Sequence, residues 1–128
     1  MPTLQKDAQI LHFQHTLWQN ELSFFEDELR IFERRLGELV QRVEDRTALA
    51  KLEHFQNQFI RQKEVLDELK HDIKVHDQAL ARLLQQDDSP DENDAERHRE
   101  VDEQMVAYRK IYNDLKANFH QFMKENMG

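Results

Sequence analysis

Apolar residues recur along the first third of the chain with steps that alternate between three and four positions. This spacing is a heptad repeat, which is typical of α-helices that pack together along one continuous seam. It runs without a break and predicts one helix over about residues 4–44. Gly37 lies inside this range but off the seam, so it lowers helix propensity without interrupting the pattern. The seam consists of Leu4, Ala8, Leu11, His15, Trp18, Leu22, Phe25, Leu29, Phe32, Leu36, Leu39 and Val43.

The same predicted helix carries a second row of large apolar residues. At 100° per residue, this row points roughly 160° away from the seam. A bundle core needs only one seam, so we expect the second row to face away from the core and to be available to a partner. The alternative is that this helix is wedged between its neighbours and buries both rows. The second row consists of Ile10, Phe13, Leu17, Phe24 and Ile31, with Asn20 and Asp27 at its polar steps.

Two further segments repeat the heptad pattern and predict helices over about residues 48–86 and 90–126. Each seam is mostly apolar and includes a histidine. The seam of the middle segment is Leu52, Phe55, Phe59, Gln62, Leu66, Leu69, Ile73, His76, Leu80 and Leu83. The seam of the last segment is His98, Val101, Met105, Tyr108, Tyr112, Leu115, Phe119 and Phe122.

The connections between these segments contain residues that can cap a helix. Asp45 or Thr47 can accept a hydrogen bond from the first turn of the middle helix. For the last helix, we expect Ser89 as the N-cap, Pro90 at the first helical position and Glu92 as the partner in a capping box.

The three predicted helices have similar lengths and are joined by short connections, which force neighbouring helices to run antiparallel. The sequence therefore predicts an all-α fold. It should be a single domain over residues 1–128, an antiparallel up-down-up three-helix bundle with the left-handed packing of coiled coils.

Composition excludes several classes of function. The chain has 128 residues, two glycines, no cysteine and a net charge of −8. The negative charge argues against nucleic acid or an anionic membrane as a partner, and no apolar run approaches the roughly 18 residues of a membrane span. Without cysteine there is no disulfide, thiol nucleophile or zinc–cysteine site, and without more glycine there is no phosphate-binding loop. We therefore expect a cytoplasmic protein that is not an enzyme.

The charge is distributed unevenly along the expected rod. Residues 30–64 and 110–128, which should share one end, contain 11 basic and 8 acidic residues, a net charge of +3. The rest of the chain contains 7 basic and 18 acidic residues, a net charge of −11. One end should be strongly acidic and the other mildly basic.

Three seam histidines are expected in one layer of the bundle. The short connections imply that facing residues of the first two helices have numbers that sum to about 91, and those of the last two to about 176. His15 then faces His76, and His98 lies within about one turn of the same layer. These histidines could form a buried polar layer that fixes the register, or they could bind zinc or another transition metal.

The sequence predicts a protein–protein interaction or scaffold module without a cofactor. The second apolar row would bind a second copy of the chain, as a homodimer, or another helical protein. The alternative is a helical bundle that binds a metal or a small ligand through the histidine layer.

Overall fold

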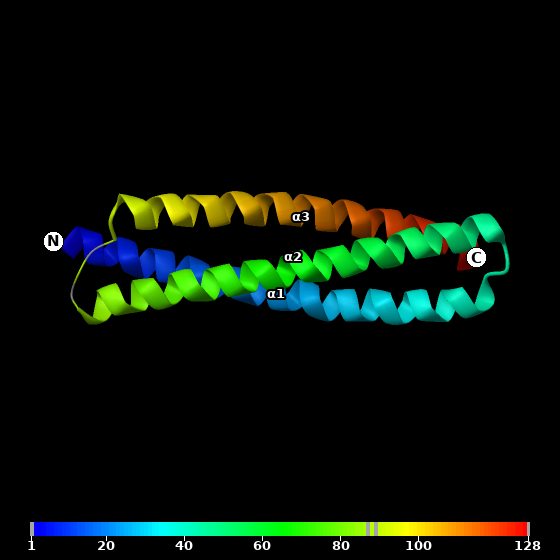
Figure 1. The fold of residues 1–128 in the computed structure, drawn as a ribbon, viewed down its shortest axis with the longest axis horizontal. Coiled ribbons are helices and arrows are strands. Elements are labelled where there is room, and N and C mark those ends of the chain that lie inside the picture. Colours follow the sequence, from blue (N-terminus) through cyan, green and yellow to red (C-terminus); the bar gives the residue numbers. More distant parts are fainter. Residues whose placement is uncertain (1, 87, 89, 128) are drawn as a thin grey trace.

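The computed structural model describes residues 2–86, 88 and 90–127, and the side chains from residue 8 to residue 126 within those ranges. It contains three long helices, α1 (Pro2–Arg42), α2 (Arg46–Gln85) and α3 (Glu92–Met127). No strand occurs among the described residues. The predicted all-α, three-helix fold is confirmed, and the observed helix ends lie within two residues of the expected ones (Figure 1).

The helices lie side by side along the whole rod, with the α1–α2 connection and the C-terminus at one end (Figure 1). The ring centroids of His15 and His76 are 4.8 Å apart, and those of Phe32 and Phe59 are 5.9 Å apart. Both pairs have numbers that sum to 91, so α1 and α2 run antiparallel in the expected register. The left-handed supercoil and the single-domain organisation stay predictions.

The core contains residues from the seams of all three helices. Burying a large apolar side chain contributes roughly 1.5–3 kcal/mol, so a continuous seam explains why helices of such polar composition associate. Leu11, Val43 and Leu83 are only partly buried near the helix ends, and the side chain of Leu4 lies outside the described residues. Aromatic rings fill the half of the core next to the α1–α2 connection, where Phe59 and Phe119 pack with ring centroids 5.1 Å apart.

The N-cap of α2 is Asp45, whose Oδ2 accepts a hydrogen bond from the backbone N–H of Ala48 at 3.0 Å. Thr47, the other candidate, lies inside the helix. This capping bond satisfies one of the backbone donors that a helix leaves unpaired in its first turn.

The expected start of α3 is wrong by two residues. The helix begins at Glu92, so Pro90 is not its first residue, and Ser89 lies outside the described residues. Asp91 caps the helix instead: its Oδ1 accepts from the backbone N–H of Asp94 at 2.9 Å, and Asp94 Oδ2 accepts from the backbone N–H of Asp91 at 3.0 Å. Asp91 and Asp94 thus form a capping box, in which each side chain accepts a hydrogen bond from the backbone of the other. Their carboxylates also interact favourably with the positive end of the helix dipole.

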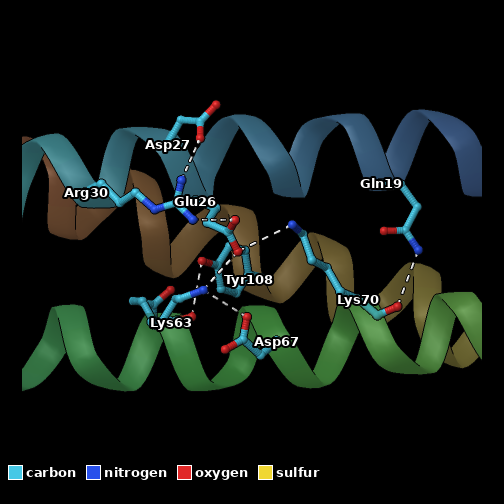
Figure 2. Close-up of polar contacts among 9 residues, drawn as sticks. Gln19, Glu26, Asp27, Arg30, Lys63, Asp67, Lys70 and Tyr108 are labelled. Atoms are coloured by element: carbon cyan, nitrogen blue, oxygen red, sulfur yellow. Dashed lines mark hydrogen bonds and ion pairs between the residues drawn. The ribbon is translucent and has the colours of Figure 1, made fainter.

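A polar network links α1 to α2 near the middle of the rod (Figure 2). The Glu26 carboxylate accepts hydrogen bonds from Lys63 Nζ at 2.9 Å, Lys70 Nζ at 3.4 Å and Arg30 Nη2 at 3.1 Å. The hydrogen bond from Lys63 is the main reason that the pKa of Glu26 lies below its usual value. The Lys63 side chain is partly exposed and the Arg30 side chain is exposed. Because ion pairs in contact with water contribute little to stability, the main effect of this network is to favour the observed register of α1 and α2.

Candidate functional site

The second apolar row of α1 is exposed to solvent along its whole length. Ile10, Phe13, Leu17, Phe24 and Ile31 each expose between 50% and 61% of their surface. The wedged arrangement, in which α1 buries both rows, is therefore wrong. We call these five residues the outer face of α1.

Uncharged residues surround most of the outer face. Gln9, Thr16 and Ser23 are exposed and lie beside it, and the exposed Asn20 lies within the row, although 34% of the chain is charged. Asp27, which is also exposed, is the first charged residue within the row. From residue 9 to residue 24, the border of this row contains one acidic residue, the partly buried Glu21, whose Oε1 accepts a hydrogen bond from Arg109 Nε at 2.7 Å.

Sequence reasoning did not find a surface groove of about 690 Å³ between α2 and α3. Val65, Leu69, Ala107 and Ile111 line it together with charged side chains such as Arg61. A heptad pattern gives no signal for such a groove, because it cannot show how far apart two helices lie. The groove holds no cluster of groups that points to a particular ligand.

The three seam histidines meet as expected, in the acidic half of the rod. One nitrogen from each of His15, His76 and His98 lies within 4.8 Å of the other two. His15 and His76 each expose 1% of their surface, and His98 is partly buried. Trp18 closes one side of the cluster, since its ring stacks on His98 with centroids 4.8 Å apart.

Polar residues around the cluster orient two of the imidazoles. His15 Nδ1 lies 3.0 Å from Asp77 Oδ1, and His98 Nε2 lies 2.5 Å from Gln14 Oε1. With the Gln14 amide in this orientation both oxygens accept, so each of these ring nitrogens carries the proton. His12 Nδ1 also contacts Asp77 Oδ1, at 2.6 Å. His12, Gln14 and Asp77 were missed from the sequence because they lie beside the seams, although Asp77 directly follows His76 and His12 lies one turn before His15.

His76 has no such partner. Neither its Nδ1 nor its Nε2 forms a hydrogen bond, although both atoms are buried. A buried polar atom without a partner is uncommon in folded proteins, since its desolvation is not compensated.

Burial lowers the pKa of all three cluster histidines below the usual value, because desolvation disfavours the imidazolium. For His15, the hydrogen bond to Asp77 opposes this effect only in part. The histidines are therefore neutral at pH 7, which is the form that donates a lone pair to a metal ion.

Comparison of the chain with protein-family models, curated proteins and solved structures finds no match. Within the part of the chain that the structure describes, no helix combines the length and apolar character needed to cross a membrane. The function is therefore inferred from the residues of this chain alone.

Proposed function

We propose that the protein is a non-enzymatic scaffold that associates with a second copy of itself through the outer face of α1. The observation that carries this proposal is the row of five large apolar residues at heptad spacing, each of which exposes half or more of its surface to water. Scattered single apolar residues are normal on protein surfaces, but several large ones along one face of a helix favour an interaction site.

A second copy in antiparallel orientation is the occupant that the outer face fits. If Leu17 lies on a two-fold axis, Ile10 of one copy comes opposite Phe24 of the other, and the reverse contact is equivalent. Such self-complementarity is what a two-fold symmetric interface requires. Glu21 comes opposite Phe13 of the other copy and is paired with Arg109 of its own chain, so this arrangement brings no like charges directly opposite each other.

Charge supports the same orientation. Residues 30–64 and 110–128, in the half of the rod at the α1–α2 connection, carry a net charge of +3. In the antiparallel dimer this half lies toward the end of the other copy that contains the α2–α3 connection. There, residues 86–96 contain six acidic and no basic residues. Opposite charges at the two edges of an interface favour one orientation over the other.

The association is tested by sedimentation velocity over a range of protein concentrations, with Phe13→Glu and Phe24→Glu variants. Burying a whole phenylalanine side chain contributes about 1.5–3 kcal/mol, and each substitution acts twice in a symmetric dimer. With about 60% of the surface of each phenylalanine exposed, the dissociation constant should rise at least about 30-fold, which corresponds to about 2 kcal/mol. Circular dichroism should show an unchanged monomer fold.

The matched control is Ile60→Glu, which changes an exposed isoleucine of α2 that has polar neighbours one turn away. It should leave the dissociation constant unchanged. A wild-type protein that stays monomeric at high concentration, or an equal effect of Ile60→Glu, would contradict the proposal.

The orientation is tested by cross-linking, because the chain has no cysteine of its own. Leu17→Cys should give a disulfide-linked dimer under mild oxidation, since the two thiols meet at the axis. Ile31→Cys is the control, because the two copies of that position lie far apart in the antiparallel dimer. Cross-linking of both variants to the same extent would indicate a parallel dimer instead.

A further inference from the structure

The histidine cluster has a geometry that a polar layer alone does not explain, and this feature is independent of the outer face. We propose that His15, His76 and His98 bind one divalent transition metal ion of the kind that prefers imidazole ligands, with Zn²⁺ as the reference ion. Imidazole nitrogens suit zinc, copper and nickel, and three protein ligands with an open fourth position form a known kind of zinc site.

The first argument is the arrangement of lone pairs between His15 and His98. Asp77, and Gln14 in the amide orientation of this structure, place the protons of these histidines on His15 Nδ1 and His98 Nε2. The remaining nitrogens, His15 Nε2 and His98 Nδ1, therefore both carry lone pairs, and they face each other at 3.2 Å. Two lone pairs at this distance repel unless a cation lies beside both of them.

The distance also fits a metal site. Tetrahedral zinc with zinc–nitrogen bonds of about 2.0–2.1 Å separates its ligand nitrogens by about 3.3–3.4 Å. The separation of 3.2 Å between His15 Nε2 and His98 Nδ1 is close to this value. The third ligand atom, from His76, lies within 4.8 Å of the others. A rotation of the His76 side chain is the main adjustment that the site needs.

The second argument is His76 itself. Both of its nitrogens are buried and lack a hydrogen bond, so the imidazole has a free lone pair at the centre of the bundle. A metal ion would give one of these nitrogens a partner. A layer that served only to fix the register would be better satisfied by a side chain with hydrogen bonds on both sides.

The surroundings favour a cation. The cluster lies in the half of the rod whose residues carry a net charge of −11. Asp77, on the outer side of His15, has the position of the carboxylate that commonly orients a metal-binding histidine and strengthens its lone pair.

The chief alternative is a proton shared between His15 and His98 without any metal. Such a shared proton would still leave both buried nitrogens of His76 without a partner. A rotated Gln14 amide would also satisfy the pair without a cation, but it would leave His76 unpartnered.

The experiment is a titration of the full chain with Zn²⁺ after treatment with a chelator, followed by calorimetry and by thermal unfolding. We expect one Zn²⁺ per chain and a rise in melting temperature with Zn²⁺ concentration. His76→Leu should weaken binding at least 100-fold, and His71→Leu, which changes an exposed histidine of the same helix, should alter it less than two-fold. Titration with Co²⁺ should give a visible absorption spectrum that His76→Leu abolishes.

A second pair of variants keeps the three ligands in place. Asp77→Asn should weaken Zn²⁺ binding about 10- to 100-fold, as expected for the loss of an orienting carboxylate. Asp72→Asn, at an exposed position of α2, should not. Absence of stoichiometric binding, or equal binding by His76→Leu and the wild-type protein, would overturn the proposal. The monomeric Phe13→Glu variant should bind Zn²⁺ normally, so failure of the dimer and failure of the metal site can be told apart.

Discussion

Replacing His76 with leucine should stabilise the metal-free protein, although it removes a residue from the centre of the core. The imidazole is 1% exposed, and neither nitrogen has a hydrogen-bond partner. Leaving a buried polar group unsatisfied costs about 1–3 kcal/mol, whereas leucine has a similar volume and no polar atom. Its seam neighbours Ile73 and Leu80 are fully buried aliphatic residues, so a leucine side chain continues their surface.

The expected gain in the free energy of unfolding is therefore about 1–3 kcal/mol. For a chain of 128 residues, each kcal/mol corresponds to a rise of about 4 °C in melting temperature, so the shift should be about 4–12 °C. Urea denaturation followed by circular dichroism, at pH 7.5 with excess chelator, measures the gain directly. The slope with urea should not change, since the same surface is exposed on unfolding.

His71→Leu is the matched control, because it places the same side chain one turn or so away at an exposed position. Its effect should stay within about 0.5 kcal/mol. A loss of more than about 1 kcal/mol in His76→Leu would show that the imidazole makes favourable interactions in the metal-free core, and the reasoning from its unpartnered nitrogens would be wrong. In excess Zn²⁺ the order should reverse, since only the wild-type protein gains stability from binding.

Three further predictions concern the metal-free protein. Because the pKa values of His15, His76 and His98 are lowered in the fold, the unfolded chain binds more protons below its usual histidine pKa of about 6.5. Stability should be full above that pH and fall as the pH drops below it, and urea titrations that show no such fall between pH 7 and 5 would refute this. Asp91→Ala should destabilise the fold by about 0.5–2 kcal/mol through loss of the α3 cap, whereas capping by Ser89 would predict no effect. Gly37→Ala should raise the melting temperature by the equivalent of about 1 kcal/mol, because an added Cβ meets no atom within 4 Å, and a lower melting temperature would contradict this.

The three helices and the face that each of them buries could be predicted, because the heptad pattern spans many turns and the core residues follow its three- and four-residue steps. His15 and His76 were placed opposite each other from the position of the α1–α2 connection, since a short connection leaves little freedom in the register. Exposure of Phe13 and Phe24 followed from the same angular argument.

The start of α3 could not be predicted in the same way, because Ser89 and Asp91 offer equivalent capping chemistry two residues apart. The local pattern does not decide between them. The polar shell of the histidine cluster was missed for a different reason: contacts of Gln14 and Asp77 depend on the reach and rotamer of each side chain. The heptad position of a residue gives the side of the helix on which it lies, but not the atoms that its side chain contacts.

The two ends of the rod are held together by different chemistry, and they should therefore open under different conditions. Near the α1–α2 connection, the rings of Phe55, Phe59 and Phe119 pack with centroids 5.1–6.4 Å apart and do not titrate. At the other end, the seam consists partly of imidazoles that become unfavourable when protonated. In mild acid, amide hydrogens of residues 10–20 should exchange with solvent through local opening, while those of residues 52–60 stay protected until the whole bundle unfolds.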